Sequence, residues 1–110
     1  MLEYSFVIKA GSNTPYYCSG TTRQGASATF GVEVTHIGGS PELQVEVQHK
    51  NRADTSWTGC GWFTNITATD VHLKDVSGLK QQIRLAFSFA SGSDGEFFGF
   101  RLLPAMWRDS

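Results

Sequence analysis

The chain alternates apolar and polar residues between positions 41 and 103, most regularly in Leu43-Gln44-Val45-Glu46-Val47-Gln48 and in Ile83-Arg84-Leu85-Ala86-Phe87-Ser88-Phe89. Successive side chains of a β-strand point to opposite faces of the sheet. A period of two therefore predicts strands that have one buried and one solvent-exposed face. Several such segments in succession are typical of a stack of antiparallel strands.

Strand-like segments recur at short intervals, separated by residues that favour turns. We expect strands at 3–10, 28–37, 43–49, 57–63, 71–76, 80–90 and 96–103, with a short one at 16–18. The glycine-rich turn 38–41 predicts a hairpin between the strands on either side of it. Gly59 and Gly61 predict a bulged strand. Pro104 is expected to end the last strand, because proline has no backbone N–H to donate.

These segments predict an all-β fold, a single antiparallel β-sandwich of about seven or eight strands, of jelly-roll or Ig-like type. One domain is expected over residues 1–110, with 1–27 as an N-terminal strand and loop arm and 104–110 as a C-terminal tail. A chain of 110 residues is long enough to bury a core without metal ions or disulfides. Cys18 and Cys60 are therefore expected to be free thiols, with a disulfide between them as the less favoured alternative.

The charge pattern argues against two classes of partner. Nine Lys and Arg residues balance ten Asp and Glu residues, and the basic residues form no cluster. This distribution disfavours nucleic acid, which attracts clustered positive charge, and it equally disfavours a membrane surface. No apolar run approaches the roughly 18 residues that span a bilayer. The first nine residues lack the features of a signal peptide, so we expect synthesis in the cytoplasm.

The residues that usually carry chemistry are scattered. His36 and His49 continue the inward faces of their strands, so a hairpin at 38–41 would bring them near each other. A metal site would need further ligands that the sequence does not supply. No nucleophile motif accompanies the histidines, and no pair of acidic residues stands out as a glycosidase pair. The sequence therefore predicts no enzyme activity, no metal site and no cofactor.

The aromatic residues are the more informative side chains. Trp57 and Trp62 are five positions apart and are expected on opposite faces of one strand, with Trp57 as the core residue. Trp62 would then contribute, with Phe63 and the two tyrosines at 16 and 17, to an exposed aromatic platform. Trp107 either anchors the tail on a neighbouring subunit or folds back over one end of the sandwich. The candidate partner-interface residues are Tyr16, Tyr17, Arg23, Trp62, Met106, Trp107 and Arg108.

The order of the segments resembles a family of small tailed-phage virion proteins. The resemblance covers about residues 30–103. Its most specific elements are the strand Leu43-Gln44-Val45-Glu46-Val47-Gln48, the triplet Thr55-Ser56-Trp57, and Val76-Ser77-Gly78-Leu79-Lys80 followed by Arg84. The loop 51–54, the strand residues 60–63 and the tail after Pro104 depart from the family pattern, and these departures leave the partner open.

The resemblance implies a β-sandwich that acts without chemistry, as a decoration or cement protein on the outside of a capsid. Such a protein would bind the major capsid protein and stabilise the shell. Symmetric shells favour a homotrimer on a local three-fold axis, and many weak contacts would reinforce one another. The alternative is a carbohydrate-binding or adhesion module associated with the tail or fibre, for which an aromatic platform would be the binding surface.

Overall fold

A computed structural model describes residues 5–9, 16–18 and 20–109. Its regular elements are strands, which occupy β1 (Ser5–Lys9), β2 (Tyr16–Tyr17), β3 (Thr21–Thr22), β4 (Ser27–Gly38), β5 (Glu42–Lys50), β6 (Thr58–Trp62), β7 (Val71–Val76), β8 (Gln82–Ser91) and β9 (Phe97–Arg108). The predicted all-β fold is confirmed. The short strand β3 lies in a segment that the sequence presents as loop.

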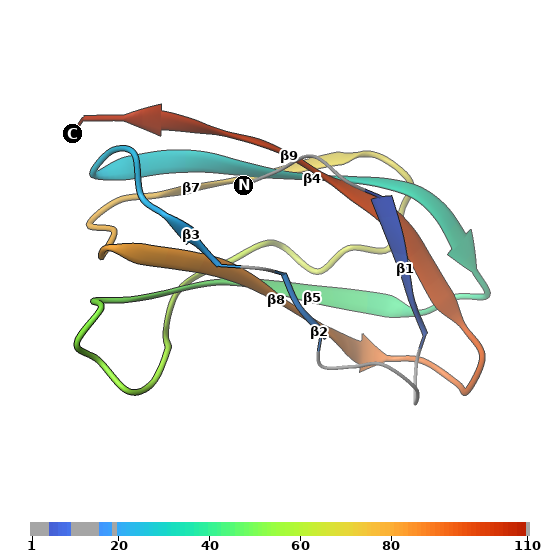
Figure 1. Cartoon of the computed structure of the whole chain (residues 1–110). Coiled ribbons are helices and arrows are strands. Elements are labelled where there is room, and N and C mark those ends of the chain that lie inside the picture. The colour runs from blue at the N-terminus through green and yellow to red at the C-terminus, as the bar shows by residue number, and fades with distance from the viewer. Residues whose placement is uncertain (1–4, 10–15, 19, 110) are drawn as a thin grey trace.

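The strands form two antiparallel sheets that pack face to face (Figure 1). Sheet A has the order β1-β9-β4-β7, and sheet B has the order β2-β8-β5-β6, with β3 also paired to β8. The pairs β1–β9, β2–β8, β4–β7 and β5–β6 are nested one inside another, as in a long hairpin rolled into two layers. This nesting is the jelly-roll topology, so the sandwich is of the jelly-roll type.

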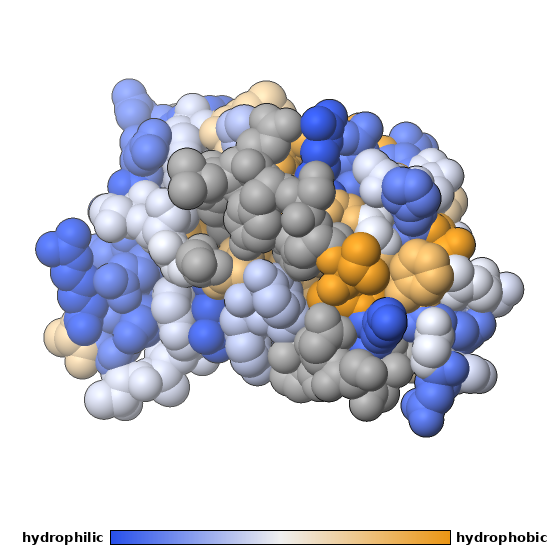
Figure 2. All heavy atoms as spheres, turned by 45° about the vertical axis from the view of Figure 1, so that its right-hand side comes forward, coloured by the Kyte–Doolittle hydropathy of each residue, from blue (hydrophilic) through white to orange (hydrophobic). Residues whose placement is uncertain are grey.

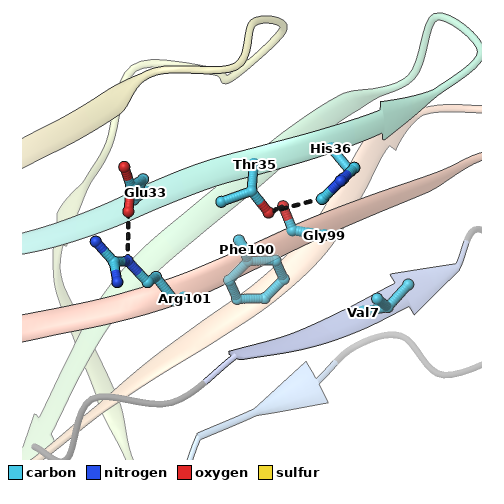
Figure 3. A pocket seen from close by; sticks show the side chains of 7 residues that line it. All are labelled: Val7, Glu33, Thr35, His36, Gly99, Phe100 and Arg101. Atoms are coloured by element: carbon cyan, nitrogen blue, oxygen red, sulfur yellow. Dashed lines mark hydrogen bonds and ion pairs between the residues drawn. The ribbon is translucent and has the colours of Figure 1, made fainter.

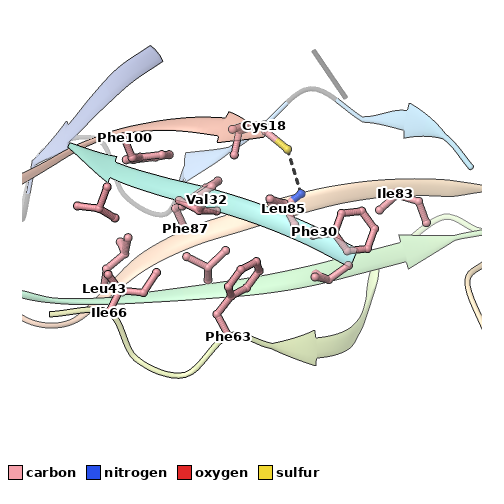
Figure 4. Packing of buried hydrophobic residues seen from close by; sticks show 14 of the residues in the cluster. Cys18, Phe30, Val32, Leu43, Phe63, Ile66, Ile83, Leu85, Phe87 and Phe100 are labelled. Atoms are coloured by element: carbon pink, nitrogen blue, oxygen red, sulfur yellow. Dashed lines mark hydrogen bonds between the residues drawn. The ribbon is translucent and has the colours of Figure 1, made fainter. Parts of the chain in front are cut away.

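The core lies between the two sheets and is built from the inward faces of the alternating strands. Along β5 the burial alternates residue by residue, and the same holds for the first half of β8. Four phenylalanines are the largest fully buried side chains, namely Phe30, Phe87, Phe98 and Phe100. The rings of Phe87 from sheet B and Phe100 from sheet A stack across the interface with their centroids 4.6 Å apart (Figure 4). The predicted two-residue period therefore identifies the side chains of these strands that form the core.

The hairpin predicted at 38–41 is wrong, because β4 and β5 belong to different sheets. Figure 1 shows the chain passing from the layer of β4 to the layer of β5 at this turn. Both strands carry strongly apolar faces, which are buried most fully when they meet across the core. Gly39 adopts a left-handed conformation (φ +83°) at this crossing, which glycine allows without steric cost. Glu96, the residue just before β9, accepts a hydrogen bond from the backbone N–H of Ser40 at 2.8 Å and so stabilises the turn.

The prediction that Pro104 ends the last strand is also wrong, because β9 continues to Arg108. The register with β4 shifts between Leu103 and Met106, so that one residue of β4, Phe30, lies opposite two of β9, Pro104 and Ala105. This bulge contains Pro104 and leaves its missing N–H outside the regular ladder, the position in which sheets tolerate proline. Within residues 104–109, the segment predicted as a tail is therefore mostly part of strand β9, paired with β4.

A second bulge reverses the orientation of a predicted inward residue. Between Val34 and His36 the chain of β4 contains one extra residue, Thr35, relative to β9. One inserted residue moves the following side chain to the opposite face. His36 is therefore exposed on sheet A, near the turn, whereas His49 is buried at the far end of β5 in sheet B. The predicted approach of the two histidines does not occur.

Candidate functional site

Exposed apolar side chains gather on the outer faces of both sheets. Among the described residues, the large apolar side chains with high exposure are Tyr17 and Trp62 on sheet B, and Val7, Val71, Leu73 and Met106 on sheet A. Figure 2 shows one side of the molecule, where several apolar residues lie together right of centre and others are scattered among hydrophilic residues. Scattered single apolar residues need no explanation, whereas grouped ones indicate a contact surface.

The outer face of sheet B carries three aromatic residues. Tyr17 and Trp62 are 46% and 52% exposed, and Trp57 is half-buried there rather than in the core. The prediction of Trp57 as a core residue, opposite Trp62, is wrong because Cys60 forms a bulge in β6. Residues five positions apart in a regular strand face opposite sides, but the inserted residue shifts the alternation by one. Both tryptophans therefore lie on the same face. Phe63 takes the inward position instead and is buried.

The guanidinium group of Arg84 lies between two of these rings. Its central carbon is 4.0 Å from the centroid of the Tyr17 ring and 4.5 Å from that of Trp57. The ammonium group of Lys50 is 5.3 Å from the Trp57 ring centroid. Cation–π contacts of this kind contribute about 0.5–1 kcal/mol each at exposed sites. They hold the two rings and the guanidinium in a defined arrangement.

A line of hydrogen bonds crosses the same face. Arg84 donates from Nε to Oε1 of Gln48 at 2.7 Å, and Gln48 donates from Nε2 to Oε1 of Glu46 at 2.7 Å. The carboxylate of Glu46 rests over Gly59, where a β-carbon would lie 2.0 Å from Oε2. Glycine at this position therefore lets Glu46 lie flat against β6. The result is an ordered polar line flanked by the exposed aromatic rings.

A small pocket continues this face beside Trp57. Its volume is about 160 Å³, and it is lined by Gly20, Thr21, Thr22, Trp57 and Gln82. At about 30 Å³ per molecule of liquid water, this space corresponds to about five waters. Threonine hydroxyls and a glutamine amide both donate and accept hydrogen bonds. The pocket therefore suits a small ligand group that carries hydroxyls.

Two predicted interface residues of the N-terminal arm lie away from this face. Tyr16 packs inward, with its ring centroid 6.2 Å from that of Phe87. Arg23 is exposed, and its backbone N–H donates to the carbonyl of Gln81 at 2.9 Å. Its Nη1 atom donates to the carbonyl of Leu79. Arg23 thus holds the arm against the turn before β8. Of the predicted interface residues in the arm, Tyr17 lies on the outer face with Trp62.

The three candidates near the C-terminus divide between the two faces of sheet A. Trp107 points inward and meets the ring of Phe30 edge to face at 6.0 Å. Met106 points outward and is 55% exposed. Arg108 donates from Nη1 to the hydroxyl of Thr29 at 2.8 Å, and its Nη2 lies 4.0 Å from Asp75. Of the two expectations for Trp107, folding back over the sandwich describes its position.

The outer face of sheet A carries an apolar patch formed by Val71, Leu73, Leu103 and Met106. Leu73 and Leu103 approach each other over Gly31, since a β-carbon at Gly31 would lie 3.1 Å and 2.9 Å from their methyl groups. The Glu33–Arg101 ion pair lies beside Val71 in the same row of the sheet. The hydrogen-bonded group of Arg108 borders the other side. An apolar centre with a polar rim is the usual anatomy of a protein–protein interface.

A second hollow of about 480 Å³ opens on sheet A between β1, β4 and β9 (Figure 3). The Glu33–Arg101 ion pair lies at one end of it. At the other end Thr35 donates to the carbonyl of Gly99 at 3.2 Å, and His36 shares a hydrogen bond with the Thr35 hydroxyl at 3.0 Å. Glu33 and Arg101 neutralise each other across this hollow. We therefore assign the hollow to the polar rim of the sheet A patch and not to a reaction site.

The titratable side chains show local structural effects. Burial raises the pKa of Cys60 to about 11, with the Glu46 carboxylate acting in the same direction. Burial also raises the pKa of Cys18, and both thiols are free, as predicted. Burial, and then the Lys80 ammonium, lower the pKa of His49. Among residues 5–9, 16–18 and 20–109, no group of three or more His, Cys, Asp or Glu side chains is arranged to hold a metal ion.

Arg84, Gln48 and Glu46 form a surface site that the sequence did not predict. Their alternation with buried residues places them on an outer face, but it does not reveal that they are hydrogen-bonded neighbours from two strands. The register of β5 against β8, which sets Gln48 opposite Arg84, supplies that information. A polar residue on each of two adjacent strands was the only available signal.

Comparison of the chain with models of protein families, with curated proteins and with solved structures finds no match. The part of the chain that the structure describes contains no helix that is long and apolar enough to cross a membrane. The interpretation of function therefore rests on the fold and on the two outer faces.

Proposed function

We propose that this protein is a non-enzymatic virion structural protein, a capsid decoration or cement protein that binds the outside of the major capsid shell and stabilises it. The observation that carries the proposal is the sheet A patch, in which Leu73 and Met106 are 57% and 55% exposed inside a polar rim. A further support is the resemblance of residues 30–103 to small tailed-phage virion proteins. Jelly rolls also recur in viral capsid domains, although a fold alone does not define a function.

The proposal assigns the patch to the contact with the major capsid protein. Full burial of an exposed leucine or methionine contributes roughly 1.5–3 kcal/mol, and a little over half of each side chain is still exposed. Loss of both side chains should therefore weaken binding by at least about tenfold. The rigid sandwich would sit on the particle exterior as a homotrimer at local three-fold positions. Repetition of the contact over the shell would make a modest single affinity sufficient.

The first test is the number of copies of this chain per purified particle, measured by quantitative mass spectrometry against the major shell protein. A ratio near one copy per shell subunit supports decoration. A few copies confined to the tail contradict it.

A pair of variants tests the contact surface itself. The double variant Leu73→Ser with Met106→Ser should lose particle association while keeping its unfolding temperature. The matched control is Trp62→Ser, which removes an exposed apolar side chain of the opposite face and should bind particles normally. Equal particle binding by the double variant and the unmodified chain would refute the assignment of the patch.

A further inference from the structure

One row across the outer face of sheet B places an exposed aromatic ring at each end. Tyr17 is paired with Ala86, Ala86 with Glu46, and Glu46 with Trp62, so the row crosses all of β2, β8, β5 and β6. Neighbouring strands lie about 4.8 Å apart, which puts the backbones of Tyr17 and Trp62 roughly 14 Å from each other. The small side chain of Ala86 lies between them. The row is therefore a strip of the sheet face between two exposed aromatic rings, referred to as the groove.

The floor of this groove offers hydrogen-bonding groups of both kinds. Glu46 presents carboxylate oxygens, which accept hydrogen bonds. Arg84 donates to Gln48 through Nε, and no described residue accepts a bond from its two Nη groups. The rings of Tyr17 and Trp57 hold the guanidinium at 4.0 Å and 4.5 Å. An acceptor and a donor thus lie at defined positions close to an exposed ring.

We propose that this groove binds a neutral oligosaccharide of more than one pyranose ring. A pyranose has an apolar C–H face, which stacks on aromatic rings, and a rim of hydroxyls that both donate and accept hydrogen bonds. Trp62 and Tyr17 supply the stacking surfaces, while Glu46 accepts from hydroxyls and Arg84 donates to them. The cavity of about 160 Å³ beside Trp57 adds threonine hydroxyls and an amide on the same face.

Charge distinguishes the proposed ligand from other candidates. This face carries charges of both signs, the Glu46 carboxylate against the Arg84 guanidinium and the Lys50 ammonium, so an acidic sugar or a phosphate attracted by the cations is repelled by Glu46. Neutral hydroxyls bind both kinds of group, because they donate to the carboxylate and accept from the guanidinium. A peptide that adds a strand to a sheet uses an exposed sheet edge, and the groove runs over the face instead. A neutral saccharide is therefore the ligand that matches both the rings and the polar groups.

This proposal does not rest on the decoration role. The groove lies on sheet B and the docking patch on sheet A, so the two surfaces are on opposite sides of the sandwich. A copy docked through sheet A would present the groove to the surrounding solution. The isolated chain is expected to bind the sugar whether or not it assembles on particles.

The test is binding of the purified chain to an array of neutral and acidic glycans, followed by titration calorimetry with each neutral glycan that binds. We expect Trp62→Ala to raise the Kd at least tenfold and Trp62→Phe to restore most of the affinity. Glu46→Ala, which removes the acceptor, should also weaken binding. Met106→Ala, an exposed residue of the opposite face, is the matched control and should bind as the unmodified chain does.

Four results would overturn the inference. The first is the absence of binding to every neutral glycan at millimolar concentration by a chain that unfolds cooperatively. The second is binding confined to acidic glycans, and the third is unchanged affinity in Trp62→Ala. Proline-rich peptides are tested in the same way, since they also bind aromatic grooves. The fourth result is binding of these peptides without binding of any glycan, which would equally refute the sugar assignment. Particle copy number is unaffected by any of these outcomes.

Discussion

Replacement of Trp107 by alanine separates a core role from an interface role at the end of β9. The indole lies beside Ala28 in the sheet register and contacts Phe30 edge to face at 6.0 Å and 82°. Removal of a fully buried tryptophan costs about 3–5 kcal/mol, and the ring here is half-buried. We therefore expect a loss of about 2 kcal/mol in the free energy of unfolding. For a domain of this size, that loss lowers the unfolding temperature by roughly 10 °C.

The assay is thermal and urea unfolding of Trp107→Ala beside Met106→Ala. Met106 is the adjacent residue on the opposite face of the strand and is 55% exposed, so its replacement should change the stability by less than about 0.5 kcal/mol. The urea midpoint of Trp107→Ala should fall while its slope stays unchanged. Equal unfolding temperatures for the two variants would refute the inward position of the indole and restore Trp107 as a surface anchor.

Three further predictions concern titratable groups. Two backbone N–H groups lower the pKa of Glu96 below its ordinary value of 4.5, so its contribution to stability is present above pH 4.5 and is lost as the pH falls through the lowered value; Glu96→Gln should narrow the gap in unfolding temperature between pH 6 and pH 3. Burial and Lys80 lower the pKa of His49 below 6.5, so stability falls as the pH drops from 6.5 through the folded value; His49→Gln should flatten that part of the curve, and an unchanged curve would contradict the assignment. The thiolate is the reactive form of cysteine, and burial raises the pKa of Cys60 to about 11 and raises that of Cys18 as well. Both thiols should therefore react slowly with a thiol reagent at pH 8 until the chain is unfolded. Rapid labelling of the folded chain would argue against their burial.

The sequence predicts features that depend on one strand alone, and it does not predict features that depend on contacts between distant strands. Alternation within β5 identified its buried residues correctly, because facing in or out depends only on the pleat of a single strand. The same local rule placed Trp62 on an outer face. The hydrogen bond between Arg84 and Gln48 on that face could not be predicted, because the two residues are 36 positions apart in the chain.

Bulges account for most of the incorrect predictions. Extra residues at Thr35, at Cys60 and around Pro104 each shift the register by one position. A one-residue shift moves every following side chain to the other face. For this reason His36 points outward, and Trp57 lies on the outer face of sheet B rather than in the core. Only for Cys60, flanked by two glycines, did the sequence indicate a bulge, and even there the consequence for Trp57 was not predicted.

The amino-acid sequence by itself determined the class of the fold, the positions of most strands and the residues that build the core, because these depend on hydrophobicity and on the two-residue period of a strand. The tertiary structure decided which strands pair, that the turn 38–41 joins two sheets, and which side chains meet on each outer face. Pairing in a jelly roll joins strands from opposite ends of the chain, and its free energy arises from contacts that do not exist until both sheets have formed. For that reason the aromatic groove and the sheet A patch become visible only in the folded molecule.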